Sequence, residues 1–580
     1  MTRTTQWAIL LVVLFLIVSM VIVIGVLLTM SGGSVSWTPQ KVLYVKLQGA
    51  VPELRSRDPL SELLTRDLVD FRDLLDALES AGTDDRIEEV LLDIRDVSMG
   101  WAQAEELREA LFRLREQRKY ATAYFETAGE MLGANGSYYV ATACDEIVLA
   151  PPGDINLTGL MAETPFLRGM FEKLEITPQF GQRKEFKNAV NTFTEKGYTP
   201  AHRAATEALL DSIYDEMVTG IARGRGLTPE RVRELIDGGP YTATEALESE
   251  LVDRLAYHDE LVTAVEERVE QFEPLIGIRR YLKGRRPHSS GGDKIAVIYG
   301  VGTIVRGPSQ GDPLMGELMG SDTITAAFRK AQDDDDIVAV VFRVDSPGGS
   351  YVASDLIRHE VRRTRDADKP VVVSMGNLAA SGGYFVSMQG DHIFANENTI
   401  TGSIGVYSGK LVTRGFWNDK LGIRFGLIQR GENAEFMSSQ VEWDKLARER
   451  MNKLLDRIYD DFVSKAAEGR GMAIDELEPL AHGRVWTGRD ALARGLVDDI
   501  GGIDAALDKA RELAGIPEDG RYRIVVLPEP RGLFQTFFQE QDEIGALPAA
   551  TRRVLSLLGS LARAETEEGR LLDRSIPDIR

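Results

Sequence analysis

Two glycine-rich turns in the second half of the chain place a serine where it could act as a nucleophile. Residues 376–384 read GNLAASGGY, and the small residues around Ser381 would let a substrate backbone reach its hydroxyl. Residues 345–350 read DSPGGS, where N–H groups of paired glycines at a helix start can approach a ligand oxygen. Together the two turns suit acyl transfer with an oxyanion hole. Taken singly, they also fit a helix-capping serine and an ordinary tight turn.

A serine nucleophile needs a general base, and the six histidines offer none at an obvious spacing. His392 follows Ser381 by eleven residues in a strand-like segment. A lysine can serve instead if burial lowers its pKa by three to five units from about 10.4. Residues 181–188, GQRKEFKN, supply Lys184 and Lys187. A surface lysine is the alternative interpretation of either residue.

The body of the chain contains an internal duplication. Residues 209–226 and 454–471 are identical at eleven of eighteen positions, and the offset between matching segments stays between 245 and 253 residues. We therefore expect two homologous domains, 40–283 and 294–515, joined by a linker at 284–293 and followed by an extension at 516–580. Strand patterns alternate with helical ones in each copy, which predicts an α/β fold with largely parallel strands.

One α/β repeat in the second copy illustrates this pattern. The apolar run 337–342 predicts a buried strand, and the helix that follows carries Leu356, Ile357 and Val361, which we expect on one buried face.

The two copies differ at the residues that could do chemistry. Asn135 of the first copy stands opposite Ser381, and Met437 of the second stands opposite Lys187. The first copy thus keeps a lysine without the serine, and the second keeps the serine without the lysine. These reciprocal losses favour a single site to which the first domain supplies the lysine and the second the serine.

The first thirty residues decide the expected compartment. Residues 7–30 carry no charge and, as a helix, would be about 36 Å long against roughly 30 Å of hydrocarbon. We expect a retained transmembrane anchor behind a short cytoplasmic segment, 1–6, because the apolar run exceeds that of a cleaved signal peptide. Arg3 before the run favours a body on the extracytoplasmic side.

Composition excludes several classes of function. In 580 residues, 90 acidic against 68 basic side chains give a net charge of −22, which argues against a nucleic-acid partner. A single cysteine, Cys144, excludes an internal disulfide framework and a cysteine-based metal cluster within one chain. Amphipathic pieces beyond residue 514 favour packing on a neighbouring subunit over contact with lipid.

The motifs resemble the long, tandem-domain members of the signal peptide peptidase A family, also called protease IV. These are membrane-anchored serine peptidases of the crotonase/ClpP-like superfamily. The resemblance covers the anchor and the body to about residue 515. Its motifs are residues 345–349 (DSPGG), 380–384 (ASGGY), 401–405 (TGSIG) and 186–190 (FKNAV).

The resemblance assigns roles to individual residues. It implies that Ser381 is the nucleophile, that Lys187 is the general base, and that Ser403 hydrogen-bonds the lysine amine. It also implies that the oxyanion hole is formed by Gly348, Gly349 and Gly382. Such a Ser-Lys dyad needs no metal or cofactor. Family members carry an acidic residue and a proline shortly after the lysine, where this chain has Asn191-Thr192, so the choice between Lys187 and Lys184 stays open.

The resemblance also implies an architecture, an assembly, a cellular location and a class of substrate. It predicts two tandem crotonase/ClpP-like domains behind one transmembrane helix, and a homotetramer on the outer side of a bacterial inner membrane. Its substrates would be cleaved signal peptides and other unfolded apolar segments. Two alternatives are a crotonase-like acyl-CoA thioester hydrolase or hydratase and a non-catalytic membrane scaffold. Complementary losses that leave one full set of residues per chain disfavour both.

Overall fold

The computed structural model describes residues 41–54, 69–130, 133–271, 273–284, 292–312, 316–518, 520–528 and 572–574. The expected anchor at 7–30 and its preceding segment 1–6 lie outside these residues, as do most of the expected linker 284–293 and of the extension 516–580. Within the described residues, no helix combines the length and apolar character needed to cross a membrane.

The first unit is built on a six-stranded sheet whose neighbouring strands are all parallel. The strand order is β8 (Arg254–Leu255), β4 (Glu146–Leu149), β3 (Tyr120–Phe125), β2 (Glu89–Ser98), β1 (Val42–Ala50) and β9 (Leu275–Gly277). Its helices are α3 (Phe71–Thr83), α4 (Trp101–Glu116), α5 (Asn135–Ala141), α6 (Arg168–Lys173), α7 (Asn191–Thr194), α8 (Pro200–Arg225), α9 (Pro229–Gly238), α10 (Ala243–Glu248), α11 (His258–Arg268) and α12 (Ile278–Lys283).

The second unit repeats this order in a larger sheet. Its main path is β19 (Val485–Thr487), β17 (Ile400–Gly402), β15 (Val371–Ala380), β14 (Ile337–Ser346), β10 (Asp293–Val301), β21 (Tyr522–Leu527) and β22 (Leu572–Arg574), while β16 (His392–Ala395) joins β15 to β20 (Asp499–Ile500). Its helices are α13 (Ser321–Asp333), α14 (Tyr351–Asp366), α15 (Gly382–Ser387), α16 (Lys445–Arg470), α17 (Ile474–Leu477), α18 (Gly488–Ala493) and α19 (Ile503–Leu513).

The two sheets confirm the predicted α/β class and the duplication, because β20-β16-β15-β14-β10-β21 repeats the order β8-β4-β3-β2-β1-β9. Strand β21 lies beyond residue 515, where the sequence pattern ended the second domain, and pairs with β10 in parallel. In α14 the expected buried face is partly wrong. Ile357 and Val361 are fully buried, but Leu356 is half exposed because adjacent helical positions point about 100° apart.

The matching segments 209–226 and 454–471 lie in two helices of equal length, α8 and α16. Each begins at a side chain that accepts a hydrogen bond from the third helical N–H, Thr199 in α8 and Asp444 in α16. Each ends at a glycine with left-handed backbone, Gly226 and Gly471. Glycine favours that position because it adopts positive φ without steric cost.

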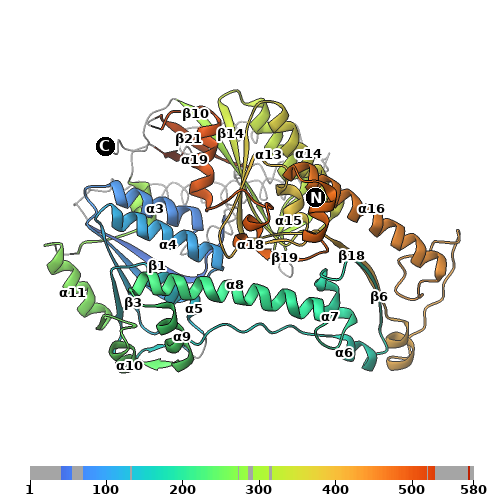
Figure 1. Ribbon diagram of the computed structural model, residues 1–580, viewed down its shortest axis with the longest axis horizontal. Coiled ribbons are helices and arrows are strands. Elements are labelled where there is room, and N and C mark those ends of the chain that lie inside the picture. The colour runs from blue at the N-terminus through green and yellow to red at the C-terminus, as the bar shows by residue number, and fades with distance from the viewer. Residues whose placement is uncertain are drawn as a thin grey trace, which may run out of the picture.

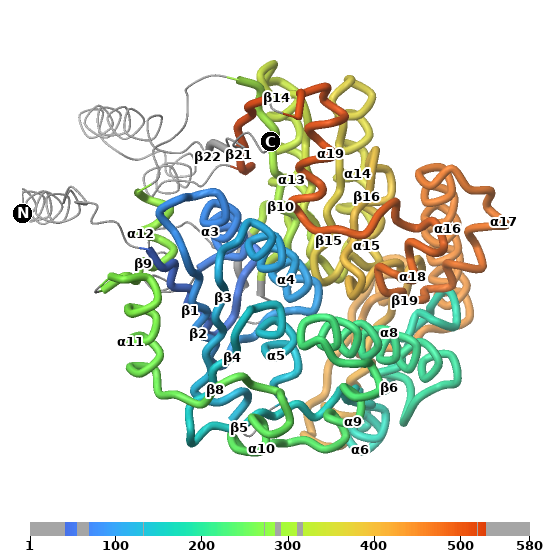
Figure 2. Tube along the Cα trace, turned by 60° about the vertical axis from the view of Figure 1, so that its left-hand side comes forward, coloured from blue at the N-terminus to red at the C-terminus, as the bar shows by residue number. Residues whose placement is uncertain are grey.

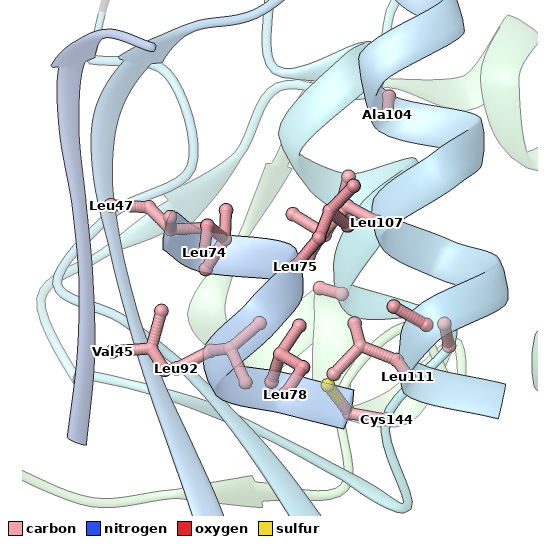
Figure 3. Packing of buried hydrophobic residues seen from close by; sticks show 14 of the residues in the cluster. Val45, Leu47, Leu74, Leu75, Leu78, Leu92, Ala104, Leu107, Leu111 and Cys144 are labelled. Carbon is pink, nitrogen blue, oxygen red and sulfur yellow. The ribbon is translucent and has the colours of Figure 1, made fainter. Parts of the chain in front are cut away.

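One hydrophobic cluster spans the two units, and a second lies within the second unit. Leu74, Leu75 and Leu78 of α3 fill the space between strands β1 and β2 and helix α4 (Figure 3). The same cluster continues into the second unit through Ile503 and Leu507 of α19, which lies beside α3 and α4 (Figures 1 and 2). Burying apolar surface between units fixes their relative placement, since separation would expose it to water.

A buried ionic network joins the units beside this core. Arg343 of β14 is completely buried and contacts the carboxylates of Glu53 and Glu106 at 2.8 Å each. Glu106, on α4, also accepts hydrogen bonds from Asn396 Nδ2 and Ile503 N, both at 2.9 Å. Carboxylates of the first unit therefore depend on donors of the second.

Three small sheets lie outside the two main sheets, and one of them connects the units at the site. Strand β6 (Thr177–Arg183) leaves the first unit and pairs antiparallel over seven residues with β18 (Val406–Val412) of the second. This arm lies beside α16 (Figure 1). Strands β5 (Asp154–Ile155) and β7 (Tyr241–Thr242) form a separate pair in the first unit. The remaining small sheet contains β11 (Thr303–Val305), β13 (Gly316–Gly320) and β12 (Gln310–Asp312).

Replacing Arg343 with methionine tests the buried network. We expect Arg343→Met to destabilise the protein by about 3–5 kcal/mol, because two buried carboxylates lose their cation. Its thermal unfolding midpoint should fall clearly. The matched control Arg203→Met removes an exposed pair with Glu207 and should change stability by about 1 kcal/mol or less. Equal midpoints for the two variants would contradict this role for Arg343.

Candidate active site

Ser381 lies at the sharp turn between β15 and α15. Its φ of 54° and ψ of −116° form a conformation that non-glycine residues rarely adopt, held by a hydrogen bond from its N–H to Gly402 O at 2.9 Å. The following glycines are required by close packing. A Cβ on Gly383 would lie 2.5 Å from Ser346 O, and one on Gly382 would lie 2.7 Å from Ser354 Oγ. The strained turn presents the serine hydroxyl at the end of a buried strand.

Lys187 reaches this turn from the other unit. It follows β6, whose pairing with β18 carries the first unit's chain to the second. Its Nζ lies 3.0 Å from Ser381 Oγ, 2.9 Å from Ser403 Oγ and 2.8 Å from the Ser403 carbonyl oxygen. The side chain is only 4% exposed. The structure thus joins two residues that are 194 positions apart in sequence.

Burial sets the protonation state of this lysine. Loss of solvation lowers the pKa of the Lys187 amine to about 7, because the charged form is disfavoured away from water. No carboxylate is among its hydrogen-bond partners in the described structure. A neutral amine within hydrogen-bonding distance of a serine hydroxyl can accept its proton at neutral pH.

A short segment around Gly483 positions Lys187 and was missed by the sequence reasoning. The N–H of Phe186 donates to His482 O at 3.1 Å, and that of Gly483 donates to Ile404 O at 2.7 Å. A Cβ on Gly483 would lie 2.7 Å from Lys187 Cα, so glycine is needed for this approach. The available signal was HGR at 482–484, directly before strand β19.

Ser403 occupies a similarly constrained position. Its φ is 54°, and its N–H donates to Arg484 O at 2.7 Å. The residue is buried, and its hydroxyl and carbonyl oxygens both lie within hydrogen-bonding distance of the lysine amine. These contacts orient Nζ toward the serine without supplying a charge.

The DSPGG turn of residues 345–349 lies directly against Ser381. Gly348 has a φ of 94°, and a Cβ there would lie 2.4 Å from Gly382 N. The N–H of Gly348 donates to Ser346 Oγ at 3.1 Å, whereas those of Gly349 and Gly382 have no hydrogen-bond partner among the described residues. The last two amides lie close together, because a Cβ on Gly382 would be 3.0 Å from Gly349 N. They are the donors available to an oxyanion.

The other candidate bases are engaged elsewhere. Lys184 forms an ion pair with Glu478 and lies 3.5 Å from His482 Nε2. His392 contacts Asp499 at 3.0 Å. The structure brings Lys187, rather than either of these residues, to Ser381.

The equivalent region of the first copy lacks both serine hydroxyls of the site. Asn135 stands where the second copy has Ser381, and its Nδ2 donates to Gly159 O at 2.7 Å. Its Oδ1 accepts from Thr158 N and Gly159 N at 3.2 and 3.1 Å. Leu157, fully buried, stands where the second copy has Ser403. The side-chain amide of Asn135 therefore stabilises the loop at Thr158 and Gly159.

Comparison with known proteins places the chain in a family. The description "Peptidase family S49" matches residues 114–271 and 363–517. The serine protease SPPA, chloroplastic, of Arabidopsis thaliana is 32% identical over 78% of this chain and 66% of its own length. Protease 4 of Haemophilus influenzae is 30% identical over 84% of this chain and 82% of its own, and that of Salmonella typhi is 29% identical over 87% and 84%.

A solved structure of a ClpP1 point mutant from Listeria monocytogenes aligns with 37% of this chain and 94% of its own, at a TM-score of 0.24 and 13% identity. The crotonase/ClpP-like assignment stays a prediction at that similarity. Two family matches that together cover more than half of the chain, and relatives that align along most of it, agree with the duplicated fold. The chain therefore belongs to peptidase family S49 and is a serine peptidase in which the family domain occurs twice.

Proposed function

We propose that this peptidase is an endopeptidase that cleaves by acyl transfer with a Ser381-Lys187 dyad. The observation that carries the proposal is the 3.0 Å contact between Lys187 Nζ and Ser381 Oγ, made by an amine whose burial lowers its pKa to about 7. A lysine that is neutral at physiological pH and held against a strained serine has the arrangement of a base and its nucleophile.

In the acylation step, neutral Lys187 takes the Ser381 proton while Oγ bonds to the peptide carbonyl carbon. The negative charge that develops on the carbonyl oxygen is stabilised by the N–H groups of Gly349 and Gly382. Gly348 shapes this turn, since its own N–H is bound to Ser346. Collapse of the tetrahedral intermediate breaks the C–N bond, and Lys187 gives its proton to the leaving amine.

Deacylation repeats these steps with water. Lys187 accepts a proton from the water as it attacks the ester carbon, and returns it to Ser381 Oγ when the acid product leaves. Ser403 holds Nζ in place during both steps through its hydroxyl and carbonyl oxygens. Over one cycle Lys187 takes one proton from Ser381 and one from water, and gives one to the leaving amine and one back to Ser381, so the starting enzyme is regenerated.

The family resemblance supports a proposal about substrate and location. We place the catalytic body on the extracytoplasmic side of a bacterial inner membrane, anchored by residues 7–30 and assembled as a homotetramer. Its substrates would be remnant signal peptides and other unfolded apolar segments. The crotonase/ClpP-like fold belongs to the same proposal, supported by the parallel α/β sheets of both units.

Removing the lysine amine tests the dyad. We expect Lys187→Met to lower kcat on an unfolded, apolar-rich peptide by about a thousandfold or more, as loss of a catalytic base does in serine peptidases. Lys184→Met, which removes a nearby lysine paired with Glu478, should keep activity within about tenfold of wild type. Full-length protein in detergent is the sample, and matched elution volumes control for folding. Normal turnover by Lys187→Met would overturn the assignment.

The pH profile tests the protonation state. Lys187 is active when neutral, so kcat/KM should rise with pH, about tenfold per unit below pH 7, and level off above it. A solvent-exposed lysine, with its ordinary pKa of about 10.4, would instead make the activity rise up to about pH 10. Steady-state rates between pH 5 and 10 distinguish the two, with circular dichroism at each pH as the control. A rise centred near pH 10 would rule out the buried, neutral amine.

A further inference from the structure

The pairing between strands β14 and β15 is interrupted directly before the two turns of the site. The register shifts between Val344 and Ser346, so Asp345 alone stands opposite residues 376–378. Such a bulge leaves N–H groups without the partners that a continuous ladder would give them. The interruption lies only a few residues before Ser381, and at the first residue of the DSPGG turn.

The carboxylate of Asp345 bridges this interruption. Its Oδ1 accepts a hydrogen bond from Leu378 N at 3.0 Å, and its Oδ2 accepts one from Asn377 Nδ2 at 3.3 Å. Gly376 permits the approach, because a Cβ there would lie 3.1 Å from Asp345 Cβ. Burial and the nearby Glu53 carboxylate raise the pKa of Asp345 to about 6, so the side chain is mostly ionised at neutral pH. We call these two hydrogen bonds the Asp345 bridge.

Asn377 connects the Asp345 bridge to the first unit. Its Oδ1 accepts a hydrogen bond from Gln103 N, in the first turn of α4, at 3.2 Å. The residue before α4 is Gly100, which has no side chain to cap the helix, and a Cβ there would overlap Asn377 Oδ1. Asn377 therefore caps a helix of the other unit. Gln103 Nε2 also donates to Glu53, the partner of Arg343, at 3.1 Å.

The first copy has a matching aspartate without the bridge. Residues 91–100, LLDIRDVSMG, align with residues 340–349, VVFRVDSPGG, and set Asp96 at the position of Asp345. Asp96 is exposed, and its side chain has no hydrogen bond or ion pair among the described residues. Of the two aspartates, the one that bonds to the neighbouring strand is the one beside the serine and the glycine turn.

The other side of the DSPGG turn is fixed independently. The N–H of Gly302 donates to Asp345 O at 2.8 Å, and that of Ile304 donates to Gly348 O at 2.9 Å. The N–H of Ser350 donates to Ile304 O, also at 2.9 Å. These backbone bonds hold the turn to the segment between β10 and β11. Loss of the Asp345 bridge should therefore shift the turn relative to β15 rather than unfold it.

We propose that Asp345 and Asn377 are positioning residues that fix the spacing of the two oxyanion donors. The Gly349 N–H lies on the segment that Asp345 begins, and the Gly382 N–H lies on the segment that continues from Leu378. Both amides must reach the same oxygen, so the two segments must keep their relative position in the transition state. The inference rests on the dyad proposed above and adds helix α4 of the first unit to the elements that shape the site.

Exchanging the two side chains tests the bridge. Asp345→Asn alone sets two donors against each other, and Asn377→Asp alone sets two carboxylates against each other. The double variant Asp345→Asn/Asn377→Asp restores every contact. Its new asparagine accepts from the Leu378 N–H and donates to the new aspartate, which still accepts from the Gln103 N–H.

Steady-state kinetics of full-length protein in detergent measure the outcome. We expect each single variant to lower kcat on an unfolded, apolar-rich peptide by about a hundredfold, with KM changed by about threefold or less. The double variant should return to within about tenfold of the wild-type kcat. Asp96→Asn makes the same change at an exposed position and should keep wild-type kinetics. A double variant no more active than the single variants would overturn the proposal.

A pair of inhibitors separates the oxyanion hole from substrate binding. In a peptide aldehyde, the carbonyl carbon bonds to Ser381 Oγ, the serine proton passes to Lys187, and the negative charge develops on the aldehyde oxygen. The matching peptide alcohol occupies the same groove but cannot form this adduct. We expect Asp345→Asn to weaken the aldehyde by about a hundredfold and the alcohol by about threefold or less. Equal losses for the two inhibitors would contradict a role in the oxyanion hole.

The Lys187→Met variant separates this inference from the dyad. Normal turnover in Lys187→Met would overturn the dyad, and the Asp345 proposal with it. Loss of turnover in Lys187→Met together with wild-type kinetics in Asp345→Asn would retain the dyad and overturn the Asp345 proposal alone.

Discussion

In the proposed dyad, the amine of Lys187 must lose its contacts with water to become a base, yet it must also remain beside a hydroxyl that a substrate can reach. Desolvation lowers its pKa to about 7, and the cost of burying the amine is limited because three oxygen contacts from Ser381 and Ser403 replace water. A negatively charged partner would counteract this lowering, since a nearby carboxylate would raise the lysine pKa again. The neutral oxygens of Ser403 orient the amine while leaving it basic.

This arrangement depends on how firmly the two units are joined. The lysine and the serine come from different units, and hydrogen-bonding geometry tolerates only a few tenths of an ångström of displacement. The shared core around α3, α4 and α19 and the buried Arg343 network hold the units together on one side. The β6–β18 ladder fixes the lysine-bearing arm on the other. Although they lie far from Lys187 and Ser381, these contacts therefore help to set the distance between the two side chains.

Duplication explains why such a division could arise without loss of the site. If the two copies once carried equivalent sets, a single intrachain junction needs only the lysine of one copy and the two serines of the other. The remaining positions are then free to take structural roles, as Asn135 does by bonding the Thr158–Gly159 backbone.

The sequence by itself determined the duplication, the α/β class, and the reciprocal distribution of Ser381 and Lys187, because repeats and hydrophobic periodicity are local patterns. It left Lys184 as an alternative base and treated Gly348 as an oxyanion donor. Only the tertiary structure decided that Lys184 pairs with Glu478, that the Gly348 N–H is bound to Ser346, and that the segment at Gly483 supports the lysine. The Gly348 bond is local and depends on the shape of the turn, whereas the contacts of Lys184 and Gly483 join residues far apart in the chain. These contacts arise only when the two units pack, and burial, rather than residue type, lowers the pKa of Lys187 to the value that the proposed base requires.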